Sequence, residues 1–241
     1  MNEKSSDKEQ FGYIEENLKR MRERIANAAL RAGRRPEEVR LMAVTKHVEP
    51  AAINCAIACG VDLIGENRVQ EFLGKREQLR LEHCEAHMIG HLQTNKIGDI
   101  LGQVDCIQSV DSLRLAQELS KRAAAKDQRC NILLEVNAGA EESKFGFSPE
   151  NLEEVLCEIA AYPGICIQGL MTVAPIFTEN RPVHPFFSIM QQLFLDISEK
   201  KLDNINMDIL SMGMSDDFEE AVAAGSTLVR LGSAIFGMRR Y

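Results

Sequence analysis

Apolar positions recur along this chain with two spacings that alternate from one segment to the next. Near the start, helical spacing links a set of apolar residues that lie between charged ones: Ile14, Leu18, Met21, Ile25 and Ala29. Gly33 and Pro36 are expected to end this first helix. Beyond it, short β-rich runs alternate with amphipathic stretches, without a linker or a low-complexity break.

The alternation predicts a single (β/α)8 TIM barrel, because parallel strands in regular alternation with helices close on themselves. The predicted strands are 41–46, 62–66, 87–90, 106–110, 131–137, 166–173, 207–212 and 227–230. The predicted helices include 50–59, 93–101, 112–126, 151–161 and a segment from Asp216 or Asp217 to Gly225. If one strand is not real, a doubly wound open sheet is the alternative. We expect residues 1–10 to be a flexible N-terminus and residues 11–241 to form the barrel.

Composition narrows the class of protein. The chain has 241 residues and a formal net charge of -8, without a long basic run, which argues against nucleic acid or an anionic membrane as a partner. Its cysteines number seven, and none forms a Cys-x-x-Cys pair, which is typical of reduced, buried cysteine. The N-terminus lacks an apolar signal core, and no segment is apolar enough to span a bilayer, so we expect a cytoplasmic protein.

Lys46 is the residue most suggestive of chemistry, because it closes the otherwise apolar run 41–46. Active sites of TIM barrels lie at the carboxyl ends of the strands, so this amine is expected at the mouth of the core. Amines in such positions form Schiff bases with aldehydes, pyridoxal phosphate among them. The alternative is a lysine that simply reaches water at the end of a strand.

The last two strand ends carry groups that suit a phosphate. The loop 211–215 joins a strand to a helix, and exposed amides at a helix N-terminus bind phosphate oxygens. Alternatively, Ser215 or Asp216 merely caps that helix. Gly232 would let the backbone approach a phosphate closely. Arg230 would keep the pyridine nitrogen of pyridoxal phosphate unprotonated, or would form a structural ion pair that closes the barrel.

Other polar residues leave their roles open. Asn67, after the second strand, could hydrogen-bond a ligand hydroxyl or fix Lys46, or it could cap a helix that begins at Arg68. The loop around Lys144 could be a mobile lid or an ordinary solvated loop. Three histidines are spaced by four, but the predicted strand 87–90 breaks their common face, so we expect no metal site: His83, His87 and His91.

Several segments together resemble the pyridoxal phosphate homeostasis proteins of the YggS/PROSC type, from about Phe11 to Gly237. The segments that carry this resemblance are 42–46, 64–71, 87–96, 109–112, 144–147, 169–172, 210–217 and 229–237. The resemblance implies a barrel like the N-terminal domain of fold-type III alanine racemases, with pyridoxal 5'-phosphate held on Lys46 as a Schiff base. It further implies that Arg230 lies near the ring nitrogen and that the phosphate is held by Ser211, Met212, Gly213, Ser215, Gly232 and Ser233. It also implies a non-catalytic buffer or carrier, with apo-enzymes that need the cofactor as expected partners.

The residues themselves favour a carrier over a racemase. A two-base racemase needs a second proton donor on the opposite face of the substrate carbon. The tyrosines are Tyr13, Tyr162 and Tyr241, and none of them ends a predicted strand. We expect no C-terminal β domain, because the chain stops four residues after Gly237. A racemase or lyase that uses the same cofactor, and a cofactor-free Schiff-base aldolase acting on a sugar phosphate, remain as alternatives.

Overall fold

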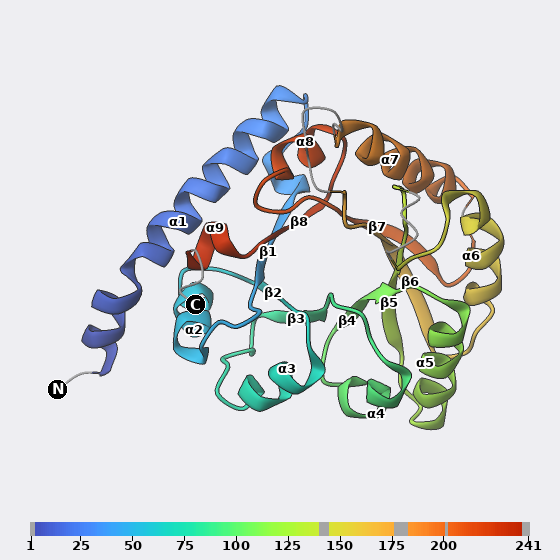
Figure 1. The fold of residues 1–241 in the computed structure, drawn as a ribbon, viewed down its shortest axis with the longest axis horizontal. Helices are drawn as coiled ribbons and strands as arrows, with labels where there is room; N and C mark the ends of the chain where they lie inside the picture. Colours follow the sequence, from blue (N-terminus) through green and yellow to red (C-terminus); the bar gives the residue numbers. More distant parts are fainter. Residues whose placement is uncertain (1–2, 140–144, 176–182, 201, 238–241) are drawn as a thin grey trace.

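Eight parallel strands close into a barrel in sequence order, and β8 pairs with β1 (Figure 1). The computed structural model describes residues 3–139, 145–175, 183–200 and 202–237. The strands are β1 (Arg40–Val44), β2 (Leu63–Glu66), β3 (Glu85–Met88), β4 (Cys106–Val110), β5 (Cys130–Glu135), β6 (Ile165–Met171), β7 (Ile205–Ser211) and β8 (Leu228–Leu231). The closed ring confirms the predicted TIM barrel and excludes the open sheet.

Helices surround the barrel (Figure 1). They are α1 (Glu3–Arg31), α2 (Pro50–Ala58), α3 (Val69–Arg76), α4 (Ile97–Ile100), α5 (Leu113–Ala125), α6 (Leu152–Ala160), α7 (His184–Ser198), α8 (Phe218–Ala223) and α9 (Ser233–Phe236), with the short 3-10 helices η1 (Pro36–Glu38), η2 (Thr94–Lys96) and η3 (Pro149–Asn151). The predicted helix 93–101 is divided between η2 and α4. Sequence analysis did not delimit α7, because exposed apolar residues such as Ile189 and Leu195 blur its buried stripe.

Two strand ends differ from the prediction. The first strand ends at Val44 instead of Lys46, because a turn begins there in which His47 has φ +60. The third strand covers Glu85–Met88 instead of 87–90. The first shift leaves Lys46 just beyond its strand end, which is where loops of this fold carry function.

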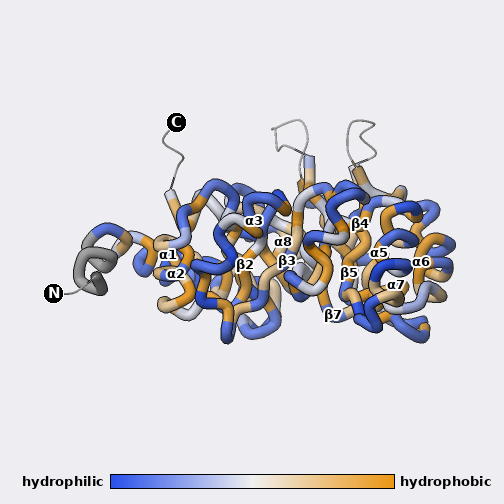
Figure 2. The backbone as a smooth tube through the Cα atoms, turned by 90° about the horizontal axis from the view of Figure 1, so that it is seen from below, coloured by the Kyte–Doolittle hydropathy of each residue, from blue (hydrophilic) through white to orange (hydrophobic). Residues whose placement is uncertain are grey.

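The first helix lies across the outside of the barrel, next to α2, α8 and α9 (Figure 1). Its buried face includes Ile14, Leu18 and Met21, as the spacing predicted. The side view in Figure 2 shows α1 beside α2 at one end of the molecule and α5, α6 and α7 at the other, with apolar and polar residues mixed along these helices. Because α1 begins at Glu3, residues 3–10 belong to a helix, and the flexibility expected for 1–10 stays a prediction.

The core has an outer and an inner part. The outer part fills the space between strands and helices and contains most of the buried apolar residues. Inside the barrel, Met42, Leu63 and Leu228 form one small cluster. Cys106, Leu133 and Met171 form another. Among the described residues, none of the helices combines the length and apolar content that crossing a bilayer requires.

Candidate functional site

The carboxyl ends of all eight strands meet at one rim, because every pair of neighbours is parallel. Lys46 follows β1, Asn67 follows β2, Ser211 ends β7 and is followed by the loop to Ser215, and Gly232 follows β8. The fold therefore gathers at one end of the barrel the residues that the sequence had singled out from four separate segments.

Lys46 lies two residues beyond the end of β1 and is partly buried. Lys46 lies in the turn that follows β1, and this turn belongs to the carboxyl-end rim of the barrel. Within the part of the chain that the structure describes, the Lys46 amine has neither a hydrogen-bond partner nor an ion-pair partner. This amine is therefore available to a ligand at the mouth of the barrel.

A buried ion-pair network holds the residue before Lys46. The Thr45 carbonyl accepts a hydrogen bond of 2.8 Å from Lys75 Nζ, and the Thr45 hydroxyl donates one of 3.1 Å to Glu66 Oε2. Lys75 also pairs with Glu66 and, at 3.1 Å, with Glu71. The Lys75 and Glu66 side chains are only 8% and 2% exposed. The pattern of apolar positions contained no sign that Lys75 would be buried.

The same network holds the residue after Lys46. The His47 amide donates to Glu71 Oε1 at 2.5 Å. Burial raises the pKa of Glu71, but the hydrogen bonds from His47 and Lys75 outweigh it, so the net pKa is lowered and the carboxylate is charged. His47 itself is exposed and has a left-handed backbone, which agrees with a structural role. The turn that carries Lys46 is thus fastened on both sides.

Arg230 lies inside the barrel and is only 4% exposed. Its Nη1 donates to the Ser211 carbonyl at 2.8 Å and to the Ser211 hydroxyl at 2.7 Å, and its Nη2 donates to the Thr172 carbonyl at 2.7 Å. Burial lowers the pKa of Arg230 to about 10, whereas the charges of Asp217 and Glu135 raise it. All three acceptors are neutral, and Arg230 forms no ion pair within the described residues, so these contacts do not support the ion-pair interpretation.

The first two residues of the seventh loop are already paired within the protein. The Ser211 hydroxyl is fully buried and donates to Gln108 Oε1 at 2.7 Å. The Met212 side chain packs in the outer core, its amide donates to Leu228, and its carbonyl accepts from Ser226. The phosphate role implied for Ser211 and Met212 stays a prediction, and these contacts suit the support of Arg230 and of the loop instead.

The rest of the seventh loop meets the eighth. The Ser233 hydroxyl lies 3.3 Å from the Ser215 hydroxyl. Among the described residues, the backbone amides of Ser215, Gly232 and Ser233 have no hydrogen-bond acceptor. The N-cap of α8 is Asp217, which accepts from the Met214 amide, so Ser215 is not the cap. Donors from two loops thus converge on one place, which is the arrangement that binds a phosphate.

Gly213 shapes this loop. Its φ of +93 is rarely adopted by other residues, and an added Cβ would lie 2.5 Å from Ala221 Cβ. Gly232 differs, because an added Cβ there would meet nothing closer than Val44 at 3.5 Å. The seventh loop therefore needs glycine for its own fold, whereas the eighth keeps open space at Gly232.

Asn67 carries a buried oxygen without a partner. Its Oδ1 is shielded from solvent and accepts no hydrogen bond within the described part of the chain. The N-cap of α3 is Arg68, so Asn67 does not cap that helix. Gly90 allows the Asn67 backbone to lie close, since an added Cβ would be 2.3 Å from its carbonyl oxygen. An unpaired buried acceptor is costly, and a ligand hydroxyl would satisfy it.

Sequence analysis missed an acidic group on the opposite side of the rim. Burial, followed by the charge of Asp111, raises the pKa of Glu135 to about 7, although Arg230 and His91 lower it. His91 Nδ1 lies 2.7 Å from Asp111 Oδ2, and its ring stacks on Phe145. The sequence did contain a sign of this group, because Glu135 is a carboxylate within the largely apolar predicted strand 131–137. Lys144, whose loop could be a lid or an ordinary solvated loop, lies outside the described residues.

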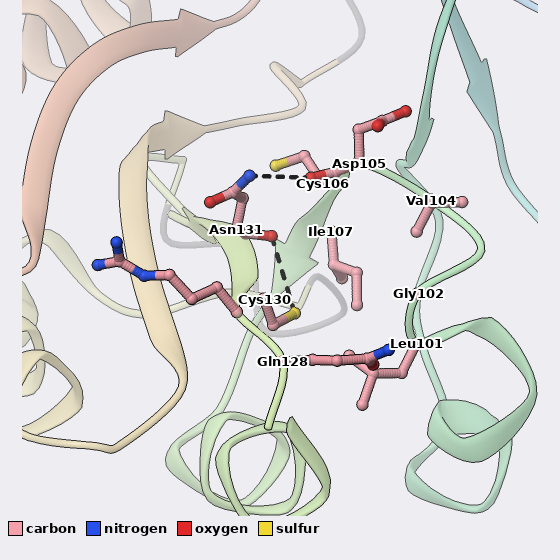
Figure 3. Close-up of a pocket in the computed structure, with 10 residues that line it drawn as sticks. Leu101, Gly102, Val104, Asp105, Cys106, Ile107, Gln128, Cys130 and Asn131 are labelled. Atoms are coloured by element: carbon pink, nitrogen blue, oxygen red, sulfur yellow. Dashed lines mark hydrogen bonds between the residues drawn. The ribbon is translucent and has the colours of Figure 1, made fainter. Parts of the chain in front are cut away.

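A separate pocket of about 220 Å³ lies at the other end of the barrel, where β4 and β5 begin (Figure 3). Asn131 donates to the Asp105 carbonyl there, beside Cys106 and Cys130. Burial raises the pKa of Cys130 to about 12, so this thiol is protonated and unreactive at neutral pH. All seven cysteines are free, as predicted, although Cys157 is exposed.

Known proteins match this chain over most of its length. Residues 14–240 match the family described as the N-terminal domain of alanine racemase. A pyridoxal phosphate homeostasis protein of Aquifex aeolicus is 42% identical over 226 residues, which cover 94% of this chain and 98% of that protein. One of Escherichia coli is 39% identical over 232 residues, covering 95% and 97%.

Solved structures show the same relationship. The structure of PipY from Synechococcus elongatus, described as having PLP bound, matches with a TM-score of 0.77 and 31% identity, covering 93% of this chain and 100% of that one. Alanine racemase from Corynebacterium glutamicum shares the fold, with a TM-score of 0.73 and 18% identity over 95% of this chain and 62% of that one. This chain therefore belongs to the pyridoxal phosphate homeostasis proteins, within the family of the alanine racemase N-terminal domain.

Proposed function

We propose that this protein binds pyridoxal 5'-phosphate covalently through Lys46 and serves as an intracellular buffer or carrier of that cofactor. The observation that carries the proposal is the unpartnered amine of Lys46, held by a buried network at the same rim as two converging phosphate-type loops. The cofactor supplies an aldehyde, which condenses with a lysine amine with loss of water. The PLP-bound relative PipY supports the choice of ligand.

The residues present suit each part of the cofactor. Free amides and the hydroxyls of Ser215 and Ser233 would hold the phosphate, on a loop shaped by Gly213 and kept open at Gly232. Arg230 would face the ring nitrogen, and two of its N–H groups have no acceptor among the described residues. The buried Asn67 Oδ1 would accept a hydrogen bond from the ring hydroxyl.

The same residues explain why storage fits better than turnover. A cation at the ring nitrogen makes the ring a poorer electron sink, because that nitrogen stays unprotonated. Neither described tyrosine ends a strand, since Tyr13 is an exposed residue of α1 that bonds to the Phe236 carbonyl, and Tyr162 follows α6 and bonds to Glu158. A site that anchors an aldehyde strongly and supports carbanions weakly suits a carrier. We further propose that it acts in the cytoplasm and delivers the cofactor to apo-enzymes that need it.

One observation favours a second candidate, an amino-acid racemase that uses the same cofactor. Glu135 has a pKa of about 7, and it lies at the rim with His91 and Asp111. A carboxyl group that titrates near neutrality can exchange protons with a substrate carbon. Incubation with a panel of D- and L-amino acids separates the two functions, because a carrier leaves each enantiomer unchanged.

The central experiment is borohydride reduction of purified, cofactor-loaded protein, followed by mass spectrometry of its peptides. We expect the modified lysine to be Lys46, and the Lys46→Ala variant to fold normally but lose both the adduct and the cofactor absorbance. Lys96→Ala is the matched control, because Lys96 also lies near this rim and forms no ion pair among the described residues. An adduct that persists in Lys46→Ala would refute the assignment, and protein that stays colourless with added cofactor would favour the cofactor-free aldolase.

A further inference from the structure

A chain of polar side chains crosses the barrel interior below Arg230. Arg230 Nη1 donates to the Ser211 hydroxyl at 2.7 Å, and that hydroxyl donates to Gln108 Oε1 at 2.7 Å. Gln108 Nε2 lies 2.8 Å from His87 Nδ1. Ser211 ends β7 and Gln108 lies in β4, which are not neighbours in the barrel, so these side chains can meet only inside it.

Such a row of polar side chains is unusual in the interior of a TIM barrel. Ser211 and Gln108 are fully buried, and His87 is 1% exposed. The interior of a TIM barrel is normally filled by branched apolar side chains, and burying polar groups is unfavourable unless each one is hydrogen-bonded. Every link of the chain is hydrogen-bonded, so the cost of burial is offset, and the side chains are restricted to one arrangement.

The hydrogen bonds of the chain run in one direction. Ser211 has a single hydroxyl hydrogen, and because it goes to Gln108 Oε1, the lone pairs of Ser211 face Arg230. Gln108 Nε2 then donates to His87 Nδ1, which assigns the His87 hydrogen to Nε2, 3.2 Å from Glu85 Oε2. The hydrogen bond from His87 and those from Arg40 lower the pKa of Glu85 to about 2 against the effect of burial, so Glu85 is an acceptor throughout the neutral range.

We propose that Gln108 and His87 are positioning residues for the cofactor ring, acting on Arg230 through Ser211. Charged Glu85 sets the tautomer of His87, His87 sets the orientation of the Gln108 amide, and that amide keeps the Ser211 hydrogen away from the guanidinium. If the hydrogen bonds between these side chains ran in the opposite direction, the Ser211 hydroxyl hydrogen would point toward Arg230. The guanidinium would then lose one of its acceptors. The inference rests on the proposed function, because it assigns the role of Arg230 at the ring nitrogen to residues that lie deeper in the barrel.

The test measures cofactor affinity and the absorbance maximum of bound cofactor in Gln108→Leu and Ser211→Ala. Loss of a hydrogen bond to a buried charged group should raise the dissociation constant by about tenfold or more and shift the absorbance maximum. Ser120→Ala is the matched control, because Ser120 is a buried serine with a 2.8 Å hydrogen bond to the Pro163 carbonyl on the outer side of the barrel. We expect both readouts to stay at wild-type values in that variant.

Rescue separates positioning from general stability. His87→Asn keeps an acceptor close to the place of Nδ1 and should retain the wild-type spectrum, whereas His87→Leu should shift it. Wild-type affinity and spectrum in Gln108→Leu would overturn the inference, as would an equal effect of Ser120→Ala. Failure of the proposed function is distinguishable, because the wild-type protein would then form no borohydride-stable adduct on Lys46. Should Gln108→Leu not fold, the comparison of His87→Leu with His87→Asn gives the same decision, because His87 reaches Arg230 only through Gln108 and Ser211.

Discussion

Replacement of Lys75 by methionine tests how the turn that carries Lys46 is held. Methionine keeps most of the apolar stem of lysine and removes its charge. The lost ammonium leaves the buried Glu66 carboxylate without its ion-pair partner and the Thr45 carbonyl without its 2.8 Å donor. Because the two side chains are 8% and 2% exposed, solvent cannot replace the missing partner.

The expected magnitude is large for a single substitution. Breaking a buried ion pair by removal of one partner costs about 3–5 kcal/mol of the free energy of unfolding. For a chain of this size, each 1 kcal/mol lowers the melting temperature by roughly 2–4 °C, so we expect a decrease of about 6–20 °C. The rate at which Lys46 forms a borohydride-stable adduct should also fall, because the turn would then be fastened on the Glu71 side alone.

The assay combines thermal and urea unfolding with the rate of adduct formation. Lys200→Met is the control, since the exposed Lys200–Glu153 pair should contribute no more than about 1 kcal/mol. The double variant Lys75→Met with Glu66→Gln should recover part of the stability, because it removes the uncompensated charge. If Lys75→Met differs from the wild type by less than the control does, the network does not hold the turn, and the reasoning is wrong.

Two further predictions concern the rim. Gly213→Ala should destabilise the protein by about 1–3 kcal/mol. Alanine would have to adopt the positive φ of this position, and its Cβ would lie 2.5 Å from Ala221 Cβ. Gly232→Ala should leave the melting temperature unchanged but weaken cofactor binding in a titration, and equal melting temperatures for the two variants would contradict the assignment. Glu135 has a pKa raised from 4.5 to about 7, so its stabilising contribution is complete below pH 4.5 and is lost as the pH rises through 7. Between those pH values the wild type should lose stability on the order of 2–3 kcal/mol, and the Glu135→Gln variant should not show this loss. Urea unfolding across the pH range measures both proteins, and the same pH profile in the variant as in the wild type would refute the raised pKa.

The sequence by itself determined the class of fold and singled out the amine that we propose as the ligand-binding group. Strand-forming runs in regular alternation with helices specify a barrel, because local periodicity decides which faces must be buried. The same alternation puts the end of each strand at one rim. Lys46, Asn67, Gly213 and Gly232 could therefore be picked out as rim residues without knowledge of any contact.

Only the tertiary structure decided which partners these residues meet. In the sequence, Lys75 is one more charged residue of an amphipathic helix, and its burial depends on Glu66 in a separate strand. Ser211 was expected to contact a phosphate at the start of a loop, yet it bonds to Gln108, which is 103 residues away in the chain. Periodicity reports the face on which a side chain lies but not the group across from it. The pairing of polar groups inside a closed barrel depends on strand register and barrel closure, which are properties of the whole chain.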